Sequence, residues 1–411
     1  MYDILCTYPL SSDLFSQAIH PKEPVIALGQ ALGHVQVQRL PTPSADNPGV
    51  PNRFGTVGTI DTAWRTRRHK GSCRALAFSH DGNKLFSAGT DGIVKIAHTN
   101  NGKVSSKIAI PLCKQEVDFP TLLHQLNPTT LLLATDSALL YVYDLRNPAP
   151  HAIKYAQPPL RPAQTFQDLH ADYVTSLSPL PSASAPGEDT KQFLTTGGTT
   201  ITITDLRKGV LKQSENLEEE LFSSTICAGK AIVGSEKGRL RVWNVGQWDD
   251  SEQTLRVDKM YDAGADVLAT MPGQESGGGG RVAVGGGDGS VRFVNVSGGK
   301  KQGRVKLEEE VISHDEMDGV IGLGWVRDGR LVSGGGQSMK IWEERRDEDR
   351  EEAQQNGIDG ESLDDERDDS DDGASGSEED APRKRRKKSK KGKGKKGRGT
   401  ESNVLKFKGL D

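Results

Sequence analysis

The sequence predicts an all-β protein in which one short repeat fills most of the chain and a charged segment follows. Three observations lead to this prediction. Pairs of short strands with alternating apolar residues recur around glycine-containing turns. Glycine is abundant, at 47 of 411 residues, whereas aromatic residues make up only 5%. The charges of the last part of the chain are gathered into an acidic block and then a basic block.

The clearest copy of the repeat is residues 84–98. An apolar strand leads into Thr90-Asp91-Gly92, and a second strand follows with Val94 and Ile96 on one face. Asp-Gly between two such runs favours a hairpin, because glycine readily adopts the positive φ of tight turns. Six further stretches have this pattern: 25–38, 131–145, 193–206, 231–245, 281–296 and 330–342.

The spacing of the copies predicts a seven-bladed β-propeller. Each copy takes about 49 residues, slightly more than the ~40–45 of a four-stranded propeller repeat. Further short strands are expected at 73–78, 174–177 and 320–325, each after a histidine (His69, His170 and His314). Insertions rich in proline, serine or glycine at 41–55, 178–190 and 271–280 account for the excess length and are expected to be surface loops.

The first residues are expected to complete the last blade. The chain becomes acidic directly after Trp342, so no outer strand follows the strand that ends there. Residues 2–8 have strand-favouring side chains and precede the first blade's inner strand, expected at 14–19. We therefore expect residues 3–7 to pair antiparallel with residues 338–342 and to cover an exposed sheet edge.

The repeats resemble the WD40 family pattern GH…(L/I)xSGxxDGxVxIWD over residues 14–342. Trp243-Asn244 and Trp342-Glu343 lie near the terminal dipeptide of that pattern, whereas the literal Trp248-Asp249 pair lies outside it. The hydrogen-bonded His–Ser–Asp–Trp set that the resemblance implies is complete in no copy. The positions matching it, which we interpret as structural, are His69, Ser87, Asp91, His170, Trp243, Asp288, His314, Ser333 and Trp342.

The order of the units and the tail is similar to the WD repeat-containing protein 55 family, which includes fungal members. The similarity rests on a degenerate propeller with a short N-terminal strand and on an acidic and then Lys/Arg-rich tail. Local phrases such as Asp81-Gly82, and Trp342 just before the acidic run, add to it. The resemblance implies a nucleolar protein tied to ribosome production.

No pattern of catalytic residues is found, so we expect no enzyme, no cofactor, no metal and no small-molecule substrate. Residues 285–290 are glycine-rich but lack the Lys-Ser/Thr of a phosphate-binding loop and lie between two strands. His314, Asp315 and Glu316 are adjacent on an extended segment, where side chains alternate in direction and rarely converge on one ion.

The cysteines and the N-terminus indicate a soluble intracellular protein without a membrane partner. The four cysteines are at least 40 residues apart, which argues against disulfides and zinc sites and suits a reducing compartment. The N-terminus lacks the basic and apolar regions of a signal peptide. No apolar run approaches the ~20 residues of a membrane helix.

The domain prediction is a propeller over 1–344, an acidic disordered linker over 345–382 and a basic disordered tail over 383–411. Residues 343–380 contain 19 acids and 4 bases, and such segments cannot bury enough apolar surface to fold. Within them, Ser375 and Ser377 resemble acidophilic phosphorylation sites. Residues 383–398 contain 12 bases and no acid, which is typical of a nuclear or nucleolar import signal. These bases are Arg383, Lys384, Arg385, Arg386, Lys387, Lys388, Lys390, Lys391, Lys393, Lys395, Lys396 and Arg398.

The resulting hypothesis is a non-enzymatic scaffold in the nucleus, and within it the nucleolus, that acts in ribosome assembly or rRNA production. Its partners are expected to be other proteins, such as preribosomal assembly factors, bound by the propeller faces, with nonspecific RNA contact by the basic tail. Two alternatives remain open: a substrate-recruiting adaptor of a ubiquitin ligase, and a chromatin-associated reader of basic peptides. Asp144-Leu-Arg146 and Asp205-Leu-Arg207 have the wrong spacing for the ligase adaptor's Asp-x-x-x-Arg pattern, and the body, residues 1–342, is near neutral.

The basic segment gives a first prediction. Deleting residues 383–398 should abolish nuclear accumulation, because the import receptor would lose the cluster of bases that it binds. Fluorescence imaging of reporter fusions with and without the segment measures this. A deletion variant that stays nuclear and nucleolar at the full level would contradict it.

Overall fold

The computed structural model describes residues 1–40, 60–146, 160–181, 190–258, 263–272, 279–297 and 304–345. The chain divides into two compact units, Met1–Ala353 and Gln354–Asp411, and all described residues belong to the first. The predicted import signal, Ser375, Ser377 and nearly all of the predicted tail lie outside the described residues. So do the whole insertion at 41–55 and parts of those at 178–190 and 271–280.

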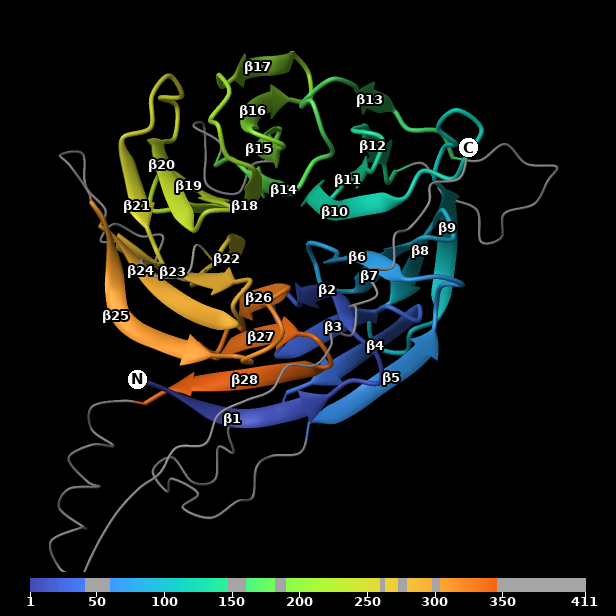
Figure 1. Cartoon of the computed structure of the whole chain (residues 1–411). Coiled ribbons are helices and arrows are strands. Elements are labelled where there is room, and N and C mark those ends of the chain that lie inside the picture. Colours follow the sequence, from blue (N-terminus) through green and yellow to red (C-terminus); the bar gives the residue numbers. More distant parts are fainter. Residues whose placement is uncertain are drawn as a thin grey trace, which may run out of the picture. The chain divides into compact units, whose positions relative to one another are not determined.

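The first unit is an all-β, seven-bladed propeller, as the repeats predict. Seven four-stranded antiparallel sheets are arranged in a ring (Figure 1). Blade 1 consists of β2 (Leu14–Ile19), β3 (Val25–Gln30), β4 (His34–Arg39) and β5 (Asp61–Arg67). Blade 2 consists of β6 (Cys73–Phe78), β7 (Lys84–Gly89), β8 (Ile93–His98) and β9 (Val104–Ala109). Blade 3 consists of β10 (Pro120–Asn127), β11 (Thr130–Thr135), β12 (Leu140–Asp144) and β13 (Gln164–Phe166).

The remaining blades follow the same order from the inner to the outer strand. Blade 4 consists of β14 (Ser176–Pro179), β15 (Gln192–Gly197), β16 (Thr200–Asp205) and β17 (Gly209–Gln213). Blade 5 consists of β18 (Leu221–Cys227), β19 (Lys230–Ser235), β20 (Arg239–Asn244) and β21 (Gln253–Arg256). Blade 6 consists of β22 (Ala265–Thr270), β23 (Gly279–Gly286), β24 (Ser290–Ser297) and β25 (Val305–Ser313). Blade 7 consists of β26 (Gly322–Trp325), β27 (Leu331–Gly335), β28 (Ser338–Glu344) and β1 (Tyr2–Pro9).

The core is divided among the interfaces between blades. Seven buried apolar clusters each combine residues of two neighbouring blades. In blades 2 and 3, for example, Phe86 and Ile108 pack with Leu131 and Tyr143. Each sheet is therefore stabilised by the blade on either side, so the ring must close for every blade to be covered on both faces.

Two inner strands begin later than the sequence predicts. The expected strand at 174–177 is β14, which starts at Ser176, and the one at 320–325 is β26, which starts at Gly322. Val174 and Val320 instead bond to the preceding blade. The Val174 carbonyl accepts a hydrogen bond from Thr121 Oγ1 at 3.3 Å, and Val320 N–H donates to the Gly286 carbonyl at 3.1 Å. Both valines are buried links between blades.

The ring closes through strand β1, which lies far from β28 in the sequence and next to it in the sheet (Figure 1). The two strands pair antiparallel, with Ile4 opposite Trp342 and Thr7 opposite Lys340. The pairing covers residues 2–9 and 338–344, so it is longer on both strands than the predicted pairing of 3–7 with 338–342. A register shift between Ile4 and Cys6 marks a bulge in β1.

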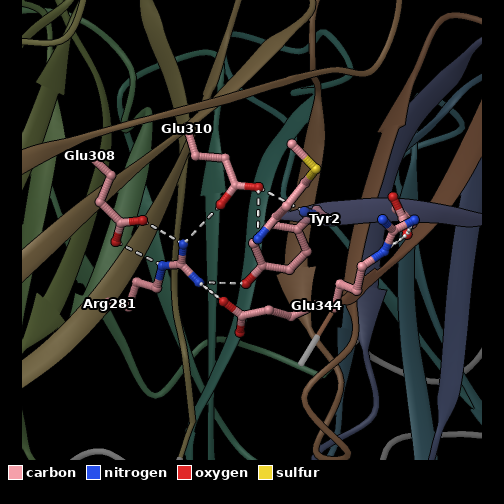
Figure 2. Close-up of polar contacts among 8 residues, drawn as sticks. Tyr2, Arg281, Glu308, Glu310 and Glu344 are labelled. Atoms are coloured by element: carbon pink, nitrogen blue, oxygen red, sulfur yellow. Dashed lines mark hydrogen bonds and ion pairs between the residues drawn. The ribbon is translucent and has the colours of Figure 1, made fainter. Parts of the chain in front are cut away.

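A polar clasp joins this closing strand to blade 6 (Figure 2). The Arg281 guanidinium on β23 donates to Glu308 of β25 at 2.8 Å, to the Tyr2 hydroxyl at 2.8 Å and to Glu344 of β28 at 2.8 Å. Tyr2 N–H donates to Glu310 at 2.7 Å. The Tyr2 ring is buried and stacks on Phe293 with centroids 4.8 Å apart, and burial raises its pKa. One partly buried arginine thus connects its own strand, β23, with three further strands of the two blades.

The last strand, β28, ends at Glu344, and the residue after it still bonds to the closing strand. Arg345 N–H donates to the Met1 carbonyl at 2.9 Å, and Arg345 Nε donates to Asp3 Oδ2 at 2.7 Å. Arg345 is therefore held against the closing strand by its backbone and its side chain. In the part of the chain that the structure describes, no helix is long and apolar enough to cross a membrane.

The closure gives a second prediction. Deleting residues 1–9 should lower the Tm by about 5 °C or more, because Tyr2 leaves a buried cluster and β28 becomes an unpaired edge. The milder variant Arg281→Met keeps the strand pairing and should lower the Tm less. Thermal unfolding followed by circular dichroism measures both.

Deletion of residues 346–411 is the matched control, and it should leave the Tm unchanged because it removes none of the described contacts. An unchanged Tm after deletion of residues 1–9, or a larger loss after the C-terminal deletion, would contradict the role of β1.

Candidate protein-interaction surface

One end of the propeller, here called the upper face, carries two sets of loops. Strands alternate in direction, so the turn between the second and third strands of a blade lies at the same end as the connection to the next blade. Hydrogen bonds tie these turns and connections together. Ile110 N–H donates to the Gly92 carbonyl at 2.9 Å, and Leu221 N–H donates to the Gly198 carbonyl at 2.8 Å. The upper face is therefore a continuous, internally bonded rim.

His69 is one of the links beneath this rim. Its Nδ1 lies 2.8 Å from Asp91 Oδ1, and its Nε2 lies 3.0 Å from Ser87 Oγ. The ring is buried between the connection of residues 68–72 and strand β7. Burial lowers the pKa of His69 more than Asp91 raises it. The structure thus brings three of the predicted positions together in blade 2.

The other two predicted histidines are buried in the same way with different partners. His170 Nδ1 lies 2.7 Å from Thr200 Oγ1, and its Nε2 lies 3.0 Å from Thr195 Oγ1. In blade 7, His314 Nδ1 lies 2.8 Å from Ser333 Oγ, which also accepts a hydrogen bond from Trp342 Nε1 at 2.7 Å. Burial lowers the pKa of His170 to about 4 because no carboxylate compensates it.

The remaining predicted positions are not joined to a histidine. Trp243 is buried in the apolar cluster between blades 4 and 5, and Trp248 packs against that cluster from outside. Asp288 accepts a hydrogen bond from Ser290 Oγ at 2.6 Å and pairs with Arg292 Nη2 at 2.9 Å. Asp288 therefore stabilises the turn of blade 6 through its ion pair with Arg292, where blade 2 uses a histidine.

Sequence reasoning missed two acidic residues in connections at this face. In blade 5, Ser235 Oγ donates to the buried Glu219 at 2.7 Å, and Glu219 also pairs with Arg239. In blade 6, Asp258 lies 3.8 Å from Arg292. These ion pairs could have been predicted from an acidic residue shortly before the inner strand of a blade and an arginine in its third strand.

The upper face also displays apolar side chains to solvent. Thirteen large apolar side chains are exposed among the described residues, and seven of them lie in the turns and connections of this face. Their clustering matters because scattered exposed apolar residues are ordinary, whereas gathered ones mark interaction sites. The seven are Leu32, Leu112, Val117, Phe119, Tyr173, Met317 and Ile321.

Charge is distributed unevenly between the two ends of the propeller. The described turns and connections of the upper face contain 17 acids and 4 bases. Those at the opposite end contain 6 acids and 10 bases. The near-neutral body therefore consists of an acidic face and a mildly basic one. Sequence counting missed this because the acids are dispersed along the chain.

Strand-borne cations neutralise only part of this charge. Arg74, Lys95, Arg239, Arg241 and Arg292 reach up from the strands and pair with acids of the upper face. Eleven of its carboxylates form no ion pair with the described residues. They are Asp13, Glu116, Asp118, Asp168, Asp172, Glu215, Glu218, Glu220, Asp315, Glu316 and Asp318.

Two hollows lie on the sides of the ring. One, of about 530 Å³ between blades 2 and 3, is bounded by Arg146 and Leu160, the described residues nearest to 147–159. The other, of about 450 Å³ between blades 1 and 2, is lined by Arg67, Lys95 and Lys107. Among the described residues, no group of three or more His, Cys, Asp or Glu side chains is placed to hold a metal ion.

Comparisons with known proteins agree with the fold. Residues 18–124 match the family model described as the anaphase-promoting complex subunit 4 WD40 domain. The WD repeat-containing protein jip5 of Neosartorya fischeri is 47% identical over 380 residues, which cover 88% of this chain and 86% of that protein. The jip5 protein of Aspergillus terreus is 48% identical, with 84% and 83% covered. The JIP5 protein of Phaeosphaeria nodorum is 45% identical, with 84% and 83% covered.

The buried histidines give a third prediction, on pH. The folded-state pKa of His170 lies below the ordinary value of about 6.5, so the unfolded chain binds more protons than the folded one between those values. Stability should therefore fall as the pH drops below about 6.5. His170 alone should account for about 2 kcal/mol of that loss by pH 5.

Denaturant unfolding at pH 7.5 and pH 5 measures the effect. The variant His170→Gln should show a smaller difference between the two pH values than the unmodified protein. The control His80→Gln, at an exposed position, should leave the difference unchanged. An equal difference in His170→Gln and the unmodified protein would contradict the assignment.

Proposed function

The chain belongs to the family of fungal WD repeat-containing proteins named jip5, and on that premise we propose that it is a non-enzymatic scaffold of the nucleus and nucleolus that acts in ribosome biogenesis. The propeller would bind partner proteins through its upper face. The observation that carries the proposal is the coincidence of seven exposed apolar side chains with eleven unpaired carboxylates on one rigid rim.

The nuclear and nucleolar part of the proposal rests on two features of the sequence. The twelve bases in residues 383–398 suit an import signal, and the order of the units is similar to the WD repeat-containing protein 55 family. Nonspecific contact of this basic segment with RNA is part of the same proposal, because lysine and arginine neutralise phosphates without reading bases. No enzyme family is indicated by the relatives or by the matching family model.

A second candidate is an adaptor that recruits substrates within a larger complex, such as a ubiquitin ligase. The matching family model, a WD40 domain of a complex subunit, favours it. The arginines of the two Asp-Leu-Arg stretches are less favourable. Arg146 Nη2 pairs with Asp144 at 2.7 Å, and Arg207 Nε lies 3.8 Å from Asp205, so each turns back to its own blade.

A fourth prediction tests the scaffold. The double variant Phe119→Ser/Tyr173→Ser, purified from nuclear extract through a tag, should lose most of the copurifying preribosomal proteins, because two exposed anchors are removed from the upper face. The control Val210→Ser/Leu211→Ser removes equally exposed apolar side chains from β17 and should retain them. Mass spectrometry with and without RNase treatment measures both.

The identity of the copurified proteins separates the candidates. Preribosomal proteins that resist RNase support the scaffold. Ligase subunits would support the adaptor instead, and histones would support a chromatin reader. Equal losses in the two double variants would contradict binding through the upper face.

A further inference from the structure

Four of the seven exposed apolar side chains of the upper face lie in the connections on either side of blade 3, together with acidic side chains. We call this area the blade 3 patch. It is formed by the connection of residues 110–119, the turn of residues 136–139 and the connection of residues 167–175. Its members are Leu112, Glu116, Val117, Asp118, Phe119, Asp136, Asp172 and Tyr173.

Four large apolar side chains of the patch are accessible. Leu112 is 63% exposed, Val117 45%, Phe119 38% and Tyr173 41%. They come from consecutive connections on either side of blade 3, and Thr121 on β10 bonds to the Val174 carbonyl at 3.3 Å between them. The two connections are therefore held next to each other, and together they provide aromatic and aliphatic anchors of the kind found at binding hot spots.

Two carboxylates of the patch, those of Asp118 and Asp172, lie within electrostatic range of Asp136. Burial, and then the neighbouring carboxylates Asp118 and Asp172, raise the pKa of Asp136, although Arg74 lowers it from 3.9 Å away. Asp118 is only 4% exposed, and Ser137 N–H donates to its Oδ1 at 3.2 Å. Its Oδ2 is buried without a hydrogen-bond partner among the described residues. A buried, unsatisfied carboxylate oxygen is costly, and an incoming donor would relieve it.

The backbone gives the patch a fixed shape before any partner arrives. Cys113 and Glu116 exchange two hydrogen bonds, of 3.1 and 2.9 Å, and Asp136 N–H donates to the Phe119 carbonyl at 2.9 Å. Between the first pair, Lys114 and Gln115 adopt positive φ values of 48° and 73°. Such a preformed surface avoids part of the entropy cost of binding.

We propose that the blade 3 patch binds a lysine- and arginine-rich segment of a partner protein that also carries apolar side chains. The cations would face the carboxylates, and the apolar side chains would pack on Phe119 and Tyr173. This inference rests on the proposed scaffold function and specifies the chemistry of its partner.

Charge complementarity favours a basic partner over the other possible occupants. A dimer that joins two upper faces would bring two acidic surfaces together, and like charges would oppose it. The chain's own basic residues 383–398 directly follow the acidic residues 343–380, which compete for them at short range along the chain.

The test uses two synthetic peptides with the purified full chain. One is rich in lysine and arginine and carries leucines, and the other has the same charge with serine in place of each leucine. Fluorescence anisotropy should show tighter binding of the leucine peptide. Phe119→Ser should weaken that binding about tenfold and should abolish the preference for leucine. The double variant Glu116→Gln/Asp172→Asn should lower the affinity for both peptides about threefold or more.

Two control variants separate the patch from other surfaces. Asp364→Asn/Asp365→Asn removes the same charge from the acidic segment, the strongest competing anion in the chain, and should change the affinity less. Val210→Ser removes an exposed apolar side chain elsewhere and should change nothing. Zero-length cross-linking of peptide lysines to carboxylates, followed by mass spectrometry, should mark Glu116 and Asp172 of the patch.

Three results would overturn the inference. The first is equal affinity for both peptides, with cross-links confined to residues 343–380. The second is a large gain in peptide affinity when the bases of 383–398 are replaced by glutamine, which would identify the chain's own segment as the occupant. The third is a dimer in sedimentation that dissociates on adding peptide. If the peptides do not bind but preribosomal proteins still copurify, only this inference is rejected. If the peptides bind but preribosomal proteins do not copurify, only the proposed function is rejected.

Discussion

The pairing of β1 with β28 is the interaction on which the rest of the structure depends. Each blade buries its apolar side chains against the next, so the core is a closed series of seven interfaces. The series closes into a ring only if blade 7 receives its fourth strand. Without that strand, blade 7 would expose both a sheet edge and an apolar face. Strand β1 supplies the missing edge, and Tyr2 fills the interface between blades 6 and 7. The Arg281 clasp fixes Tyr2 against blade 6. The guanidinium of Arg281 is largely buried, and the three carboxylates and one hydroxyl around it compensate for the loss of water.

A closed ring lets the upper face be acidic without loss of structure. Carboxylates that bond to histidine, serine or arginine, such as Asp91 and Glu219, stabilise the turns directly. The unpaired ones stand on loops whose backbone groups are already bonded to their neighbours. Apart from the buried Asp118, these side chains are at least partly exposed to solvent, so their mutual repulsion is screened by salt. Such a surface is rigid, charged and apolar in places, which is what selective recognition of a basic partner requires.

The sequence predicts the fold well because the fold is encoded locally and repeatedly. The pair of strands around a tight turn, as at Thr90-Asp91-Gly92, recurs in every blade. A strand that is weakly marked in one repeat can therefore be predicted from its position in the clearer repeats. The trio of His69, Ser87 and Asp91 could also be anticipated, since the three residues belong to one repeat. The Arg281 clasp could not, because its members are separated by up to 342 residues and meet only when the ring closes. The blade 3 patch escaped prediction for a related reason: its acids and apolar residues come from three separate loops, each of which is unremarkable in sequence.

Native-state hydrogen exchange of the full chain tests the central claim, that the N-terminal strand is an integral part of the ring. The amides of β1 and β28 should exchange only through global unfolding, with the same free energy as those of the inner strands, because opening the closure exposes interfaces on both sides. Exchange of β1 through a low-energy local opening, while β26, β27 and β2 stay protected, would contradict the account and reduce β1 to a peripheral addition.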